Sequence, residues 1–206
     1  MNTTTHEPAV TTLEKLTAPT PARLAALHER LEVAAAAEGL VDVAYATVAT
    51  PIGTLLLATT DRGLVRVAFE LEDHDRVLET LAGRIGARIL RSPRRLAAAT
   101  REIDEYFAGR RTGFDLSLDF SLSSGFRQVV QEYLPHIGYG TTQTYGSIAL
   151  LLGNPGASRA VGSACATNPL PVVVPCHRVL RSDGSLGGYL GGVDAKTALL
   201  ALEHAA

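Results

Sequence analysis

The spacing of hydrophobic and polar positions changes along the chain. Between residues 21 and 38, leucines recur at helical spacing among alanines, which predicts a helix that begins at Pro21 and ends before Gly39. From residue 41 the period shortens to two, which predicts strands separated by glycine-containing turns. The elements predicted after this change are strands at 41–50, 54–60 and 64–69, a helix at 71–85, a strand at 87–90, a helix at 93–107 and a strand at 114–118. This region is therefore predicted to be an α+β domain with a small antiparallel sheet.

Helical spacing returns after the small polar residues 121–125. The elements predicted there are helices at 126–137, 144–152 and 157–166, a buried strand at 172–174, a glycine-rich hairpin that ends at Gly192, and a last helix at 194–202 with Asp194 as its N-cap. Two short helices around the break at 153–156 have the arrangement of a helix-turn-helix, although a plain αα-hairpin would give the same pattern. We therefore expect a mobile tail and an extra helix in 1–40, an α+β domain in 41–121 and a mostly helical domain in 122–206.

The charge of the chain gives no overall attraction to nucleic acid. The 206 residues carry a formal net charge of −2, with a pI of about 6.3. The acidic excess belongs to the first 120 residues. Residues 121–206 contain five basic and four acidic side chains: Arg127, Arg159, Arg178, Arg181 and Lys196 against Glu132, Asp183, Asp194 and Glu203. Any contact of this half with DNA would depend on a few placed groups.

Cysteine content and hydropathy restrict the compartment and the chemistry. The two cysteines are too few for a disulfide framework or a zinc site made of four thiolates. No apolar run approaches the roughly 18 residues of a membrane span, and the first 20 residues lack the pattern of a secretory signal. We therefore expect a cytoplasmic protein with reduced thiols that does not associate with membranes.

Cys176 is the residue with the clearest potential for chemistry. It follows the apolar run 171–175 and precedes His177 and Arg178, so a proton acceptor and a positive charge adjoin the thiol and favour thiolate. Burial would oppose this, and an inert core cysteine remains the alternative. In an extended segment adjacent side chains point to opposite faces, so proton transfer to His177 would need a bend or a bridging water. Glu203 is one acidic candidate to orient the ring of His177. The other cysteine, Cys165, is expected to be a packing residue.

The predicted helix at 157–166 carries little bulk apart from Arg159. Gly162 within it costs about 1 kcal/mol relative to alanine, which indicates close approach to another surface. A narrow helix would fit the minor groove of DNA, with Arg159 entering the base stack. Packing against a neighbouring helix, with Arg159 solvated, explains the same residues. Tyr145 could lie at the same surface or be a half-buried packing residue.

The segment 175–179, Pro-Cys-His-Arg-Val, resembles the active-site signature of the O6-alkylguanine-DNA alkyltransferases, also called methylated-DNA–protein-cysteine methyltransferases. Further motifs fall in the order and spacing of that family. They are 144–149, 153–155, 159–162, 168–169, 187–192 and 199–203. The resemblance covers about residues 41–206, and its specific motifs lie within 126–203.

The resemblance implies a role for each matching residue. Cys176 is similar to the acceptor thiol, and His177 and Glu203 are similar to the water-linked pair that generates the thiolate. Asn168 resembles the asparagine that braces the active-site turn, and Tyr145 the tyrosine that assists the departing guanine. Arg159 resembles the side chain that fills the gap left by a flipped nucleotide. The other matching positions are those near DNA, namely Gly146, Asn154, Ala160, Gly162 and Ser182, and those of the base pocket, namely Pro175, Val179, Tyr189, Leu190 and Gly191.

The resemblance also implies the function. The chain would be a DNA repair protein that flips O6-alkylguanine, and less readily O4-alkylthymine, out of double-stranded DNA through the minor groove. It would transfer the alkyl group irreversibly to Cys176, once per molecule, as a monomer without cofactor or metal. The family often has a polar residue where Leu190 stands, so the contact to the guanine O6 would have to come from backbone NH groups or be missing. The alternatives are a lesion-binding protein without activity, against which the intact Cys176 argues, and a helix-turn-helix regulator.

Overall fold

The computed structural model describes residues 20–204, which fall into two structural units, 20–40 and 41–204. The first unit contains the helix α2, Pro21–Ala37, which begins at a proline after an N-cap at Thr20. The predicted helix at 21–38 is therefore confirmed. Except for Thr20, the predicted mobile tail lies outside the described residues.

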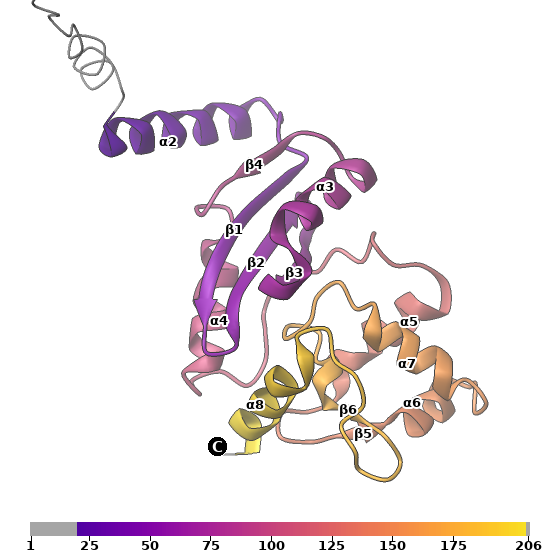
Figure 1. Ribbon diagram of the computed structural model, residues 1–206. Coiled ribbons are helices and arrows are strands. Elements are labelled where there is room, and N and C mark those ends of the chain that lie inside the picture. Colours follow the sequence, from indigo (N-terminus) through magenta and orange to yellow (C-terminus); the bar gives the residue numbers. More distant parts are fainter. Residues whose placement is uncertain (1–19, 205–206) are drawn as a thin grey trace, which may run out of the picture. The chain divides into compact units, whose positions relative to one another are not determined.

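A four-stranded sheet forms the first part of the second unit (Figure 1). Its strands are β1 (Val43–Thr50), β2 (Gly53–Thr60), β3 (Gly63–Phe69) and β4 (Ile89–Arg91), in the order β3-β2-β1-β4. The first three form the predicted antiparallel meander, and β4 pairs in parallel with β1. The α+β fold class is confirmed.

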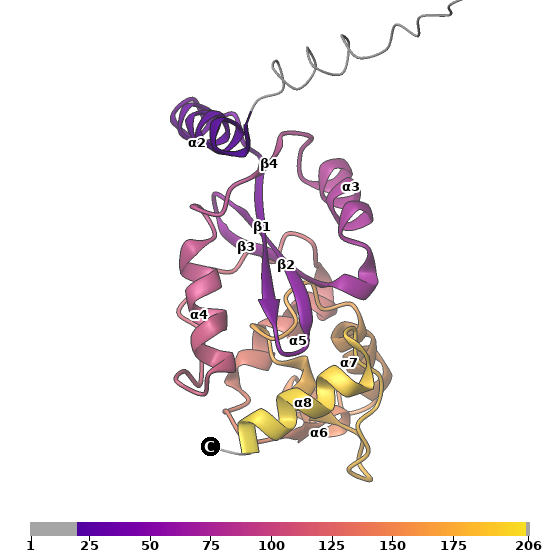
Figure 2. The same ribbon diagram turned by 60° about the vertical axis from the view of Figure 1, so that its left-hand side comes forward.

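Two helices cover opposite faces of this sheet: α3 (His74–Arg84) lies on one face and α4 (Ala97–Phe107) on the other (Figure 2). The core beneath α3 joins two residues of that helix, Val77 and Leu81, to buried side chains of the strands. On α4, Ile103 and Tyr106 are completely buried. Both helices are amphipathic, as their hydrophobic spacing predicts.

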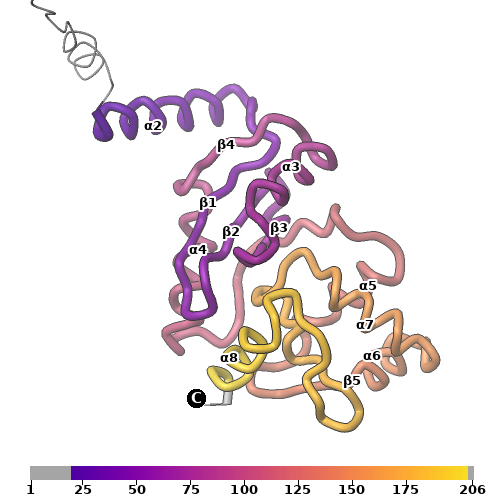
Figure 3. The backbone as a smooth tube through the Cα atoms, in the orientation of Figure 1, coloured from indigo at the N-terminus to yellow at the C-terminus, as the bar shows by residue number. Residues whose placement is uncertain are grey.

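The second part of this unit is mostly helical, as Figure 3 shows along the backbone. It contains α5 (Gly125–Tyr133), α6 (Tyr145–Leu151), α7 (Ser158–Ala166) and α8 (Gly192–His204), two short 3-10 helices at Leu134–His136 and Cys176–Arg178, and the two-residue parallel strands β5 (Gln143–Thr144) and β6 (Val179–Leu180). The short helices α6 and α7 with the turn between them are the predicted helix-turn-helix. The predicted domain boundary near residue 121 stays a prediction.

The predicted strand at 114–118 is wrong. Its backbone forms a single bridge with Leu64, through hydrogen bonds from Leu64 N to Ser117 O and from Asp119 N to Leu64 O, each 2.8 Å long. The carboxylate of Glu102 accepts the N–H of Asp115, so that group cannot join a strand ladder. A side chain thus interrupts the pairing that the alternating pattern indicated.

Three predictions in the second part are also wrong. Residues 172–174 form a turn, because Val172 has a φ of +74° and Val174 N donates to Leu170 O at 2.7 Å. The glycine-rich segment that ends at Gly192 is a loop and not a hairpin, since the strand before it pairs with β5. Asp194 lies inside the first turn of α8, which begins at Gly192, so Asp194 is not the N-cap.

No helix among residues 20–204 is long and apolar enough to cross a membrane.

Candidate active site

Asn168 holds the turn that presents Cys176. Its Nδ2 donates to Val174 O at 2.8 Å and to Cys176 Sγ at 3.2 Å, and its Oδ1 accepts the N–H of Leu170 at 3.0 Å. The same turn contains Val172, a β-branched residue in the left-handed region, which costs of order 1–3 kcal/mol. One completely buried amide thus fixes a strained loop and contacts the sulfur.

The Cys176 thiol is held in its protonated form at physiological pH. Burial raises its pKa to about 11, and the hydrogen bond from Asn168 and the charge of Lys196 only partly oppose this shift. Cys165, in α7, is also buried, and burial raises its pKa further above the ordinary range. Any reaction that uses the Cys176 sulfur as a nucleophile must therefore first remove its proton.

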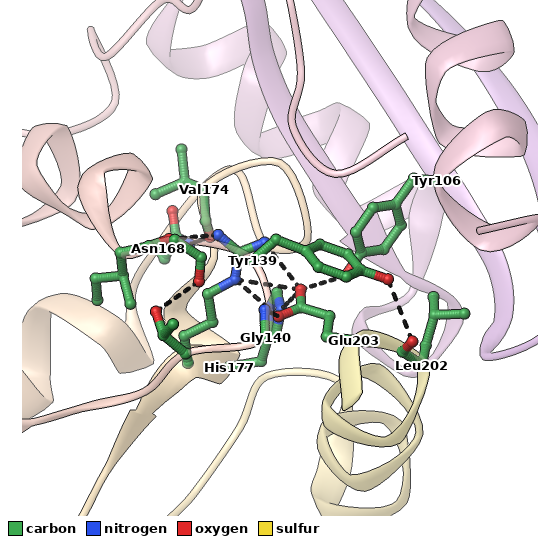
Figure 4. Close-up of polar contacts among 12 residues, drawn as sticks. Tyr106, Tyr139, Gly140, Asn168, Val174, His177, Leu202 and Glu203 are labelled. Carbon is green, nitrogen blue, oxygen red and sulfur yellow. Dashed lines mark hydrogen bonds and ion pairs between the residues drawn. The ribbon is translucent and has the colours of Figure 1, made fainter. Parts of the chain in front are cut away.

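His177 lies in the 3-10 turn and not in an extended segment, so the bend that the sequence argument required is present. Its Nε2 lies 2.8 Å from Glu203 Oε1, whereas its buried Nδ1 has no hydrogen-bond partner within residues 20–204 (Figure 4). Burial lowers the pKa of His177, although Glu203 opposes this shift. The ring is therefore neutral at pH 7, with one nitrogen able to accept a proton.

Glu203 is the centre of a buried polar network (Figure 4). Its Oε1 accepts hydrogen bonds from His177 Nε2, from Arg178 and from the hydroxyl of Tyr106, and its Oε2 accepts from Arg178 Nε and from the N–H of Gly140. Burial alone would raise its pKa, but the hydrogen bonds from His177, Arg178 and Tyr106 lower it to about 2. Glu203 is thus a carboxylate at physiological pH.

The structure corrects the expectation for Arg178. Its guanidinium binds both oxygens of Glu203 and donates to Ile137 O at 2.5 Å, so it is committed to that network. The cation that lowers the pKa of Cys176 is Lys196, which is completely buried and donates from Nζ to the carbonyls of Val179, at 2.7 Å, and Leu186. Sequence reasoning missed Lys196 and Tyr106. The one feature of the sequence that could have drawn attention to Lys196 is the scarcity of lysine, since the chain contains only two.

A cavity of about 470 Å³ brings together residues that the sequence predicted for DNA and for the base pocket. It is lined by Tyr145, Gly162, Tyr189 and Leu190, with Ala166, Arg181, Gly187 and Gly188. Gly187 has a φ of +65°, and a Cβ there would lie 2.9 Å from the Tyr145 hydroxyl, so the tyrosine requires this glycine. Burial raises the pKa of Tyr145, which keeps its hydroxyl protonated.

A second hollow, of about 310 Å³, adjoins the first at Tyr145 and Arg181. It contains the predicted residues Gly146 and Ser182, along with Ser158 and Asp183. Arg181 is exposed and lines both cavities, and sequence reasoning did not select it. The sequence feature that could have identified Arg181 is its position in a glycine-rich segment directly after the Cys-His-Arg motif.

The remaining predicted DNA contacts lie on the surface of the helix-turn-helix. Arg159 and Ala160 are exposed on α7, and Asn154 is exposed at the turn before it. A Cβ at Gly162 would lie 3.9 Å from the ring of Tyr145. The surface that Gly162 approaches closely is therefore in part the protein's own tyrosine.

Three of the predicted base-pocket residues do not line the cavity of about 470 Å³. Val179 is completely buried, Gly191 packs against the ring of Phe69, and Pro175 borders a different cavity beside Arg178. These three residues therefore lie outside the lining of the cavity beside Tyr145.

Comparison with known proteins identifies relatives for both parts of the chain. Residues 43–120 match the ribonuclease-like domain of 6-O-methylguanine DNA methyltransferase, and residues 125–205 match its DNA-binding domain. A methylated-DNA–protein-cysteine methyltransferase of Mycolicibacterium paratuberculosis is 43% identical over 162 residues, which cover 79% of this chain and 93% of the relative.

Solved structures agree with these matches. The crystal structure of Mycobacterium tuberculosis O6-methylguanine methyltransferase is 38% identical with a TM-score of 0.70. A crystal structure of the protein from that organism in complex with DNA is 40% identical with a TM-score of 0.69. In both cases 79% of this chain and 93% of the other are covered.

Proposed function

Because this chain belongs to the 6-O-methylguanine DNA methyltransferase family, we propose that Cys176 is the residue that accepts the alkyl group from O6-alkylguanine in duplex DNA. The catalytic activity, that of a methylated-DNA–protein-cysteine methyltransferase, is favoured over a lesion-binding or regulatory role. The observation that carries the assignment to Cys176 is its contact with Asn168 beside the buried His177 and Glu203 pair.

Proton removal begins the proposed reaction. The thiol gives its proton to His177 Nδ1, directly or through one water molecule, and the imidazolium that forms is stabilised by Glu203 at 2.8 Å from Nε2. Lys196 and the amide of Asn168 stabilise the negative sulfur. The base and its carboxylate are ready before DNA binds, since His177 is neutral and Glu203 is ionised.

The thiolate then attacks the alkyl carbon. A carbon–sulfur bond forms, the bond between that carbon and guanine O6 breaks, and its electron pair stays on the guanine. Tyr145 supplies a proton to the departing base, a role that its protonated, half-buried hydroxyl can fill. The product is a stable thioether, so each protein molecule reacts once.

The damaged base must leave the duplex to reach the thiol. The cavity of about 470 Å³ beside Tyr145 supports this step because it offers aromatic and glycine-rich walls for a planar base. We assign to the exposed Arg159 of α7 the role of filling the gap in the stack from the minor groove. This proposal includes a monomeric protein in the reducing cytoplasm, which suits its two free cysteines.

Intact-mass measurement tests this function. Incubation with a duplex that contains one O6-methylguanine should add the mass of one methylene group to the protein, with no further turnover. Cys176→Ala should abolish the addition, whereas the matched variant Cys165→Ala should retain it. Binding without a mass change would support the lesion-binding alternative, and repeated turnover would overturn the acceptor role of Cys176.

A further inference from the structure

We propose that a second, basic cavity of this protein binds phosphate groups of the DNA backbone, beside the cavity to which the proposed function assigns the flipped base. The inference rests on that function. The cavity has a volume of about 420 Å³ and lies between α3 and the end of α7. Its charged lining residues are Arg66, Glu72, Arg76, Arg84 and Arg127.

Only one of the four guanidinium groups is neutralised within the cavity. Arg66 forms an ion pair with Glu72 and also donates to Pro169 O at 3.3 Å. Arg84 donates to the carbonyl of Leu122 at 3.1 Å, which leaves its charge uncompensated. The side chains of Arg76 and Arg127 form no hydrogen bond or ion pair with any other residue in 20–204. Three positive charges therefore remain for a ligand.

Part of the cavity wall is apolar. Val77 and Leu81, both buried, and Leu122 line the cavity together with the arginines. A cleft with charges of one sign and low-dielectric walls focuses the electric field, which favours an anion over isolated surface arginines. Arg76, Arg84 and Arg127 are all exposed, so a phosphate can reach them without rearrangement of the core.

The position of the cavity identifies the anion as DNA. Ala166 and Leu190 line both this cavity and the one beside Tyr145, so the two adjoin. A strand whose base enters the cavity beside Tyr145 has its neighbouring phosphates within reach of the basic cavity. Arg76 and Arg84 come from the first half of the chain, so they add positive charge that the nearly neutral residues 121–206 lack.

The salt dependence of DNA binding tests the proposal. Log affinity falls linearly with log salt concentration, and each lost phosphate contact should make this negative slope shallower by about 1. The double variant Arg76→Gln with Arg127→Gln should therefore have a slope that is shallower by about 2. The matched control is Arg94→Gln with Arg110→Gln. These two exposed arginines flank α4, on the opposite face of the sheet, and their removal changes the net charge equally.

The slope of the control should equal that of the parent protein. An unchanged slope in the cavity variant, or an equal decrease in the control, would overturn the proposal. Transfer from free O6-benzylguanine base to the protein should proceed at the parent rate in both variants, because this substrate has no phosphates. Failure of that transfer in the parent protein would instead count against the proposed function.

Discussion

The hydroxyl of Tyr106 lies 2.7 Å from Oε1 of Glu203, the oxygen that also accepts the hydrogen bond from His177 Nε2. Tyr106 belongs to α4, which packs on the sheet, and Glu203 belongs to the last helix. Figure 4 shows Glu203 between Tyr106 and His177, with Tyr139 and Gly140 close to the carboxylate. The sheet region therefore contributes a hydrogen bond to the pair that we propose activates Cys176.

Replacement of Tyr106 by phenylalanine should lower the free energy of unfolding by about 1.5–3 kcal/mol, the range for a hydrogen bond to a charged group. Tyr106 is completely buried, so no water can take the place of its hydroxyl without rearrangement. Urea unfolding followed by circular dichroism measures this, since the chain has no tryptophan. The hydroxyl of Tyr45 has no hydrogen-bond partner in residues 20–204, so the matched variant Tyr45→Phe should lower the free energy of unfolding much less. Equal costs would contradict the prediction.

Acid should weaken the fold through Glu203. The pKa of this carboxylate is about 2 in the folded protein against an ordinary 4.5, so the unfolded chain takes up the proton first as the pH falls. The stabilisation is complete above the ordinary pKa and is lost as the pH falls from about 4.5 towards 2. Glu203→Gln should be less stable at neutral pH by about 3–5 kcal/mol and should lose less stability over that window. Parallel pH profiles for the parent protein and the variant would refute this.

The reactivity of Cys176 towards a small electrophile should rise steeply with pH when DNA is absent. With a pKa of about 11, the thiolate fraction increases about tenfold per pH unit between pH 7 and 10. Iodoacetamide labelling of a Cys165→Ser variant, followed by intact mass, isolates this thiol. A rate that is already constant near pH 7 would show a preformed thiolate and contradict the buried, protonated state.

Arg159→Ala should slow alkyl transfer from duplex DNA by about tenfold or more, because base flipping costs a few kcal/mol that the inserted side chain offsets in part. The reaction with free O6-benzylguanine should keep its rate, since no gap forms in a base stack. Single-turnover rates on the two substrates measure the difference. An equal loss on both would remove Arg159 from the flipping step, and Arg159→Lys, which keeps a long cationic side chain, should recover part of the duplex rate.

Local hydrophobic spacing was enough for most elements of the fold. The helix at 21–38, the three-stranded meander and the helices around the 153–156 break follow from spacing and from glycine and proline positions. The failures at 114–118 and 172–174 have a common physical cause. In both segments a polar side chain binds the backbone in place of a neighbouring strand. The carboxylate of Glu102 accepts the N–H of Asp115, and the buried amide of Asn168 holds the turn in which Val172 has a positive φ.

The sequence by itself determined the Cys176 motif and the candidate partners His177, Asn168 and Glu203, because those residues stand in a recognisable order. Only the tertiary structure decided that Tyr106, 97 positions before Glu203, reaches the same carboxylate oxygen as His177. It likewise decided that arginines from both halves of the chain line one cavity. Periodicity specifies which face of an element is buried, but contacts between distant elements depend on how those faces pack together.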